Sequence, residues 1–235
     1  MKNKYIFILT ITLIASLLLS ISSEGLKSLK LKNVEIDKKK NVLRAIGLDI
    51  VEYDNLKVDS YFSQNIDTLI IDLEGNISNE LSIQDLEEIE NNQSGEIKYF
   101  NKENEYLPIY KDNNNEVVVV PISGKGLWST LFGYFAIDSD NYSTVKGITF
   151  YKHKETPGLG GEVSKKWFQN NFIGKEIYKN EKLVSISVAK AGYADKNNLY
   201  EVDGISGATI TSNGVSTFLK RDLKRYEKYF MINRR

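Results

Sequence analysis

The strongest pattern in the chain is an uncharged apolar run close to its amino terminus. Residues 5–23 contain no charged side chain and are long enough to cross a bilayer as a helix. A cleaved signal peptide is the competing interpretation, but its apolar region is normally shorter, and no convincing Ala-x-Ala cleavage site follows this run. We therefore predict an uncleaved membrane anchor that crosses the bilayer once.

The lysines around this run bear on its orientation. Lys2 and Lys4 precede it, and further lysines follow it closely, at positions 27, 30, 32, 38, 39 and 40. By the positive-inside rule this distribution places the body of the protein in the cytoplasm. Large domains can cross the membrane regardless of their charge, so the lysine count does not decide the face by itself.

Between the anchor and the middle of the chain the pattern is mixed. Apolar positions with helical spacing predict a short helix over 36–48, followed by a turn over 49–59. Residues 68–73 read as a strand. The acidic stretch 72–105 has helical spacing between residues 81 and 89, which predicts a second short helix there.

The second half of the chain alternates strands with turns and closes on a helix. Aromatic residues between 167 and 173 predict a short helix that buries them, and residues 210–230 have the pattern of a long amphipathic helix. Pro121 is expected near the end of a strand or at a sheet edge. Strands are predicted over 117–122, 131–137, 144–151 and 183–190, the second and third joined as a hairpin through 138–141. Mostly adjacent strands followed by a late helix predict an α+β fold.

The composition excludes several classes of function. The 31 basic residues balance the 31 acidic ones, so no general attraction to nucleic acid is expected. The absence of cysteine rules out disulfides, thiolate metal sites and cysteine catalysis. His153 is the single histidine and cannot form a metal site alone, and the acidic stretch lacks the spacing of a calcium loop. We therefore expect no resident metal.

Residues 203–214 stand at the mouth of the last helix and are rich in small and hydroxyl side chains. The first N–H groups of a helix have no intrahelical partner, and the helix dipole adds partial positive charge there. Such a helix start favours a phosphate, with Gly207 and Ala208 allowing close backbone approach and Thr209 and Thr211 supplying hydroxyls. The alternative is that Ser206 or Thr209 merely caps the helix and Gly207 serves a turn.

The residues Asp203, Ser206, Gly207, Ala208 and Thr209 form an Asp-x-x-Ser-Gly-Ala-Thr sequence. This sequence resembles the flavinylation motif of the FMN-binding domain family. The resemblance implies that Thr209 is joined to FMN through a phosphodiester, attached by a flavin transferase that uses FAD as donor. It also implies that Asp203 orients the hydroxyl or binds metal during attachment, and that Ser206, Gly207 and Ala208 shape the phosphate turn.

A second motif, His-Lys-Glu-Thr-Pro-Gly-Leu-Gly-Gly at 153–161, combines a proline with three glycines in a compact loop. It resembles the flavin-facing loop of the C subunits of Na⁺-translocating NADH:quinone reductases, and of the related G subunit of the Rnf complex. Residues 42–48 and 211–215 are more similar to the C subunits. The resemblance implies that the isoalloxazine is lined by Glu155, Thr156, Leu159 and Gly160. Trp128 lies either near the ring or in the core.

The resemblance implies an electron carrier. FMN supplies the redox chemistry, so no general acid or base is needed for one-electron transfer. The chain has no NADH fingerprint and no iron–sulfur cysteines, so it depends on the other subunits of a membrane complex that passes electrons from NADH to quinone with Na⁺ export. An Rnf-type G subunit, a free-standing anchored flavoprotein and a non-redox binding module are the alternatives.

The predicted organisation has three parts. Residues 1–25 form a cytoplasmic tip and the transmembrane anchor, residues 26–115 a membrane-proximal helix with a variable acidic α/β region, and residues 116–235 the FMN-binding domain. The resemblance places this domain on the periplasmic face of the inner membrane, against the lysine count.

Overall fold

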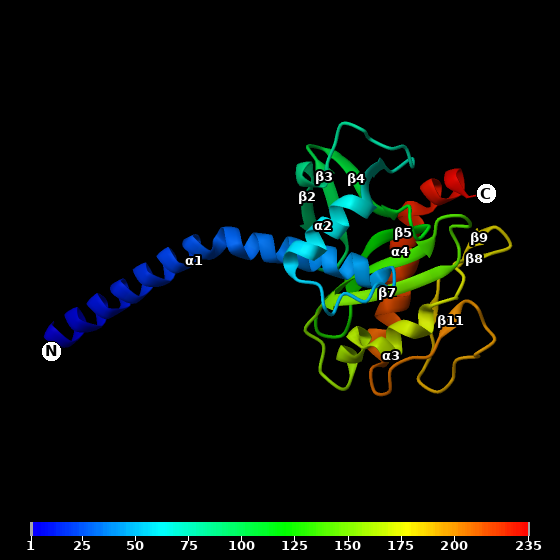
Figure 1. The fold of residues 1–235 in the computed structure, drawn as a ribbon. Coiled ribbons are helices and arrows are strands. Elements are labelled where there is room, and N and C mark those ends of the chain that lie inside the picture. Colours follow the sequence, from blue (N-terminus) through cyan, green and yellow to red (C-terminus); the bar gives the residue numbers. More distant parts are fainter. Residues whose placement is uncertain (1, 235) are drawn as a thin grey trace. The chain divides into compact units, whose positions relative to one another are not determined.

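The computed structural model describes residues 2–234, which divide after Lys39 into two compact units. The first unit consists of most of helix α1 (Lys2–Ala45; Figure 1). The side chains of residues 3–35 of this helix are exposed. Within residues 2–234, α1 is the one helix long and apolar enough to cross a membrane.

Helix α1 continues without a break through the region where a separate short helix over 36–48 was predicted, and that prediction is wrong. The sequence contains no proline before Pro108, so nothing stops the helix once it has started. Gly47, with a φ of 89°, provides the turn beyond the last helical residue, Ala45.

The second unit is built on a seven-stranded antiparallel sheet (Figure 1). Its strand order is β2-β3-β4-β5-β6-β7, and β1 pairs with β4. The strands are β1 (Ile66–Asp72), β2 (Glu87–Glu90), β3 (Ile97–Asn101), β4 (Asn104–Asp112), β5 (Val117–Lys125), β6 (Thr130–Asp138) and β7 (Val145–Lys152). Since β4 pairs with β5, the sheet includes residues on both sides of residue 115, after which the FMN-binding domain was predicted to begin.

Smaller elements complete this unit. The hairpin of β6 and β7 confirms the predicted pair of strands. Two small sheets pair β8 (Tyr178–Lys179) with β9 (Lys182–Leu183) and β10 (Ser187–Val188) with β11 (Glu201–Val202). The short helices are η1 (Ile83–Asp85), η2 (Gly160–Ser164), α3 (Lys166–Gln169) and η3 (Asn170–Phe172).

One face of the sheet is covered by the last helix, α4 (Thr209–Asn233), which lies against β5. Alternate side chains of β5, those of Val118, Val120 and Ile122, belong to the same buried cluster as the apolar face of α4. The buried apolar and aromatic residues of α4 in this cluster are Val215, Phe218, Leu219, Leu223, Tyr226, Tyr229 and Phe230. Each such side chain contributes about 1.5–3 kcal/mol by leaving water, so this face fixes the helix on the sheet.

The opposite face is covered by the end of α1 and by α2 (Asn55–Asn65). A Cβ on Gly147 of β7 would lie 2.3 Å from the carbonyl oxygen of Ala45, so helix and strand are in close contact. Phe62 of α2 packs edge-on against Tyr110, which packs against Tyr134. Both faces of the central strands are therefore buried.

Three local predictions need correction. Helix α2 begins inside the expected turn over 49–59, because the Asp54 carboxylate caps it by accepting the Lys57 N–H at 2.7 Å. The helix predicted between residues 81 and 89 is wrong: this part of the chain forms η1 and the edge strand β2. The strand predicted over 183–190 is interrupted, since Ser185 has a φ of 65° between β9 and β10.

Two side chains are also placed differently from expectation. The helix around residue 168 buries Phe168 and Phe172 as predicted, but Trp167 is 48% exposed and Ile173 is 56% exposed. Pro121 is in the middle of β5 and not at its end, but the other expectation, a sheet edge, is confirmed on the β4 side of the strand. Its missing N–H is tolerated because β4 pairs with β5 only as far as Val119, while β6 pairs along the whole strand.

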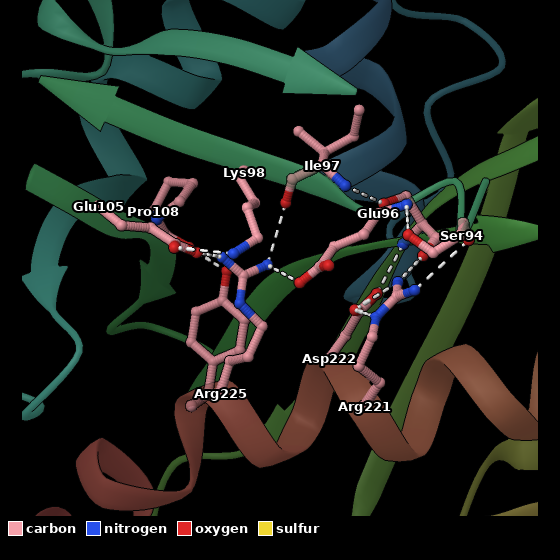
Figure 2. Close-up of polar contacts among 11 residues, drawn as sticks. Ser94, Glu96, Ile97, Lys98, Glu105, Pro108, Arg221, Asp222 and Arg225 are labelled. Carbon is pink, nitrogen blue, oxygen red and sulfur yellow. Dashed lines mark hydrogen bonds and ion pairs between the residues drawn. The ribbon is translucent and has the colours of Figure 1, made fainter. Parts of the chain in front are cut away.

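A polar network holds α4 against the sheet at its middle (Figure 2). Asp222 is 3% exposed, and its carboxylate accepts the Ser123 N–H and the Arg221 Nε–H, both at 2.8 Å. Arg221 also donates to the carbonyl of Ser123, and one turn later Arg225 pairs with Glu105 and with Glu96. These contacts fix the rotation of α4 about its own axis.

The pH dependence of stability isolates Asp222. Burial raises the pKa of its carboxyl to about 6, although Arg221 and the Ser123 N–H act in the opposite direction. The native state therefore binds this proton more tightly than the unfolded chain. The resulting stabilisation, roughly 3 kcal/mol at most, is complete below about pH 4 and is lost as the pH rises through about 6.

We expect Asp222→Asn to remove this pH-dependent contribution to stability. The free energy of unfolding of the wild type, minus that of the variant, should fall between about pH 4 and pH 6 and stay level above pH 7. Denaturant unfolding of both chains in detergent over this pH range measures the difference. A difference that does not change with pH would contradict the assignment.

Candidate functional site

Three loops meet at the amino-terminal end of α4. They are residues 126–129 between β5 and β6, residues 153–161 after β7, and residues 203–208 before the helix. Glu155 of the second loop is hydrogen-bonded to the first loop and to α4, and a Cβ on Gly207 of the third loop would lie 2.9 Å from the Leu159 side chain. Both motifs found in the sequence are thus brought together, with the 126–129 turn beside them.

Glu155 lies at the centre of this arrangement and is 5% exposed. Its Oε1 accepts the N–H groups of Trp128 and Ser129 at 2.9 and 3.0 Å. Its Oε2 accepts the Leu127 N–H at 3.2 Å and the Thr211 hydroxyl at 2.8 Å. Burial by itself raises the pKa of this carboxyl, but the four donors together hold it below its usual value, so the buried group is an anion at neutral pH.

Glycines make this close approach possible. A Cβ on Gly160 would lie 2.6 Å from both Glu155 Oε2 and Thr211 Oγ1. One on Gly126 would lie 2.8 Å from Glu155 Oε1. The family resemblance implies that Gly160 lines the flavin. In the structure this residue is buried, and only a hydrogen fits at its Cα on the side that faces Glu155 and Thr211.

The start of α4 has the features expected for anion binding. Thr209 is its first residue and is exposed, while Thr211 is 1% exposed and faces Glu155. The N-cap residue is Ala208, and among the described residues no side chain caps this end. The alternative that Ser206 or Thr209 caps the helix is therefore wrong. Gly207 has a φ of 72°, so it does serve the turn before the helix.

Asp203 is occupied by a different contact. Its carboxylate accepts the Gly192 N–H at 2.8 Å and lies 3.5 Å from the Ala194 nitrogen. The adjacent Gly204 allows close packing, since a Cβ there would lie 2.1 Å from the carbonyl oxygen of Ala189. Asp203 thus ties the 189–194 loop to the segment that precedes Thr209. Within residues 2–234 no group of three or more His, Asp or Glu residues could hold a metal ion.

Exposed apolar side chains accompany these three loops. Trp128 is 71% exposed, Leu159 43% and Ile210 58%, so the interpretation of Trp128 as a core residue is wrong. The Thr156 side chain is exposed, and its carbonyl accepts the N–H groups of Leu159 and Gly161 within the loop. Large apolar side chains in water next to an uncapped helix start are suited to a ligand with both an anionic and a flat apolar part.

Some of the site was missed in the sequence. Ser129 donates its backbone N–H and hydroxyl to Glu155 and accepts the Lys154 N–H, and Ile210 adds apolar surface next to Thr209. His153 has a local role, because its Nδ1 accepts the Glu155 N–H at 3.2 Å. Gly124 and Gly126 are typical of a turn, but nothing in the neighbouring sequence indicates that this turn faces residue 155.

Comparison with known proteins now adds to this geometry. The FMN-binding domain family matches residues 126–224, which include all three loops and most of α4. The C subunit of the Na⁺-translocating NADH-quinone reductase of Vibrio alginolyticus is 32% identical over 229 residues, covering 88% of this chain and 84% of that protein. This chain belongs to the C-subunit family of these reductases.

Solved structures of the family agree with the fold. The crystal structure of the C subunit from Parabacteroides distasonis superimposes with a TM-score of 0.71 at 29% identity, covering 87% of this chain and 96% of that one. NqrC of Shewanella oneidensis has a TM-score of 0.66 at 24% identity, covering 83% and 94%, which supports the fold alone. The predicted α+β class, an apolar helix followed by an antiparallel sheet with flanking helices, is confirmed.

The packing around Gly160 leads to a direct test. In Gly160→Ala the added methyl group collides with two buried oxygen atoms, so we expect the free energy of unfolding to fall by about 1–3 kcal/mol. Gly25→Ala in α1 is the matched control, because a Cβ there has no atom within 4 Å. Denaturant unfolding of the three chains in detergent measures the effect. Equal stability of Gly160→Ala and the wild type would show that the loop is less tightly packed than described.

Proposed function

We propose that this chain is the covalent-FMN electron-carrier subunit of a Na⁺-translocating NADH:quinone reductase, with FMN joined by a phosphodiester to Thr209. One observation carries the proposal. In a chain of the C-subunit family, the Asp-x-x-Ser-Gly-Ala-Thr sequence ends on an exposed threonine at the first position of a helix that no described side chain caps.

The direction of the two threonine side chains supports Thr209 over Thr211. Successive residues of a helix are about 100° apart, so residues two positions apart point to nearly opposite sides. Thr211 faces inward and donates its hydroxyl to Glu155, and a transferase cannot reach it without opening the loop. Thr209 is exposed beside the N–H groups of the first turn, which can hold the phosphate.

The residues around Thr209 divide into two groups by their proposed roles. Ser206, Gly207 and Ala208 form the turn next to the phosphate, where the positive φ of Gly207 brings the backbone close. Trp128, Leu159 and Thr156 offer exposed surface for the flat ring. Glu155, Gly160 and Thr211 support this surface from within, and Asp203 supports it through the 189–194 loop.

When bound, FMN supplies the redox chemistry, and the chain binds and orients it. The sequence has no NADH fingerprint and no cysteine for iron–sulfur clusters, so electrons must arrive from and leave to other subunits. The proposed partners are therefore the remaining subunits of the complex and, during maturation, a flavin transferase. NADH oxidation, quinone reduction and Na⁺ export belong to the whole complex.

We propose that α1 crosses the inner membrane once and that the flavin domain lies on the periplasmic side. The length and apolar character of α1 support the crossing. The face rests on the family resemblance, against the lysines that follow the apolar run.

An Rnf-type G subunit and a free-standing flavoprotein of the same family are the alternatives. The similarity to the C subunit of the quinone reductase over 88% of the chain favours the first proposal. Neighbouring genes for the other quinone-reductase subunits would decide between them.

The attachment site is tested by substitution of the two threonines. We expect the wild type, made together with the transferase, to carry a fluorescent flavin that survives denaturation, because a phosphodiester is covalent. Thr209→Ala should lose this flavin completely. Thr211→Val, which removes a hydroxyl without changing the shape, should keep it.

In-gel fluorescence and peptide mass mapping read out the result. A mass increase equal to FMN minus water should map to the peptide that contains residue 209. A fluorescent Thr209→Ala band would show that another residue is modified. A wild-type band without flavin would leave a non-redox binding module as the remaining interpretation.

The membrane orientation is tested by cysteine labelling, for which this chain is well suited because it contains no cysteine. Asn197→Cys places a thiol on an exposed loop of the second unit, and Asn3→Cys places one before the apolar run. In intact cells, a membrane-impermeant maleimide should label the Asn197→Cys variant and leave the Asn3→Cys variant unlabelled until the membrane is broken. The reverse pattern would place the flavin domain in the cytoplasm.

A further inference from the structure

Three successive backbone N–H groups, those of Leu127, Trp128 and Ser129, point at one carboxylate, that of Glu155. A run of N–H groups of this kind forms a concave site for an anion. A buried carboxylate in such a site also removes the cost of leaving the three donors without partners. The shape of the 126–129 loop therefore depends on Glu155.

The same carboxylate is connected to the helix. Its Oε2 accepts the Thr211 hydroxyl at 2.8 Å, and Thr211 is the third residue of α4. Gly160 packs against both groups, so the three form one buried contact. Glu155 thus joins the loop that carries Trp128 to the helical turn that carries Thr209.

The ring of Trp128 is 71% exposed, so little packing of its own side chain holds it in place. Its position depends on the backbone of its loop, and the Trp128 N–H is bound to Glu155 at 2.9 Å. An exposed aromatic side chain on a short loop would otherwise sample several positions at little energetic cost.

We propose that Glu155 is a positioning residue that does not touch the flavin: its buried carboxylate locks the Trp128 loop to the first turn of α4 and so sets the distance between Trp128 and the Thr209 attachment point. This inference rests on the proposed function, since it concerns the placement of FMN. It replaces the expectation that the Glu155 side chain lines the isoalloxazine, because both carboxylate oxygens are already engaged in the interior.

Two variants separate the shape of the carboxylate from its charge. Glu155→Gln keeps an acceptor oxygen for the Trp128 and Ser129 N–H groups and can donate its amide to Thr211, while only the contact with the Leu127 N–H is lost. Glu155→Ala removes every contact. Both are made in the full chain with Trp167→Phe, which leaves Trp128 as the sole tryptophan.

The first measurement uses protein without flavin, made without the transferase. Time-resolved fluorescence anisotropy of Trp128 reports the local motion of its ring. We expect the amplitude of the fast component of the anisotropy decay to increase in Glu155→Ala. In Glu155→Gln it should stay close to the value of the parent, the Trp167→Phe chain with Glu155 intact. Far-ultraviolet circular dichroism verifies that the fold is retained, and a variant that fails to fold is replaced by Thr211→Val, which releases only the helix side.

The second set of measurements follows the attachment of FMN by the transferase and then the potential of the attached FMN. The rate of covalent FMN attachment should fall about 10-fold in Glu155→Ala, equivalent to about 1.4 kcal/mol in the barrier, and change little in Glu155→Gln. The midpoint potential of the attached FMN should become more positive in Glu155→Gln, because a negative charge near an electron acceptor disfavours reduction. A purely structural role would not move the potential in a variant that keeps the geometry.

The outcomes are distinguishable. Equal Trp128 anisotropy and equal attachment rates in the parent, Glu155→Gln and Glu155→Ala would overturn the positioning role. An unchanged potential in Glu155→Gln would also count against it, because the carboxylate would then be too far from the flavin to set its surroundings. A parent chain that never acquires FMN but shows the anisotropy difference would overturn the proposed function and leave the lock between loop and helix intact.

Discussion

The packing of α4 across β5 is the constraint on which the rest of the second unit depends. At the crossing, the two backbones approach so closely that a Cβ on Gly124 would overlap the Phe218 side chain and one on Gly214 would lie 2.2 Å from the Lys125 carbonyl oxygen. The buried face of α4 and the Asp222 network then fix the position of the helix along its axis and its rotation about that axis. The helix start therefore has one position relative to the 126–129 turn that follows β5, and Glu155 fills the space between them.

The elements that the sequence predicted correctly are those whose signals are local. The β6–β7 hairpin, the first strand and α4 each have a pattern of apolar and turn residues that lies within the element itself. Residues 87–90 contain three glutamates, which favour a helix, yet they pair with β3 as an edge strand, and this requirement lies outside the segment. Ser185 interrupts the strand predicted over 183–190 because its φ is positive. The sequence gives no sign of this, since the residue is not a glycine.

The two halves of the candidate site differ in the same way. The proposed phosphate end depends on a local signal, because a small-residue turn before a helix provides free N–H groups whatever surrounds it. The family signature added the proposed role of Thr209 as the attachment residue. The Glu155 contacts join residues 26 to 56 positions apart, and no spacing in the sequence indicates them. The exposure of Trp128 could not be predicted from the sequence either. A tryptophan on a turn is compatible with a core or a surface position until the neighbouring elements are placed.

The openness of the site gives a physical reason for the proposed covalent bond. A cofactor held without one usually loses most of its surface to a closed pocket. Here Trp128, Leu159 and Ile210 remain exposed, and Thr209 stands on the outer side of its helix, so a flavin placed there keeps much of its surface accessible. Such access suits electron exchange with successive partners but weakens non-covalent binding. The proposed phosphodiester to Thr209 would remove this conflict, because the flavin could not leave when a partner departs. The buried anion at Glu155 would hold the surrounding loops in place without closing over the ring.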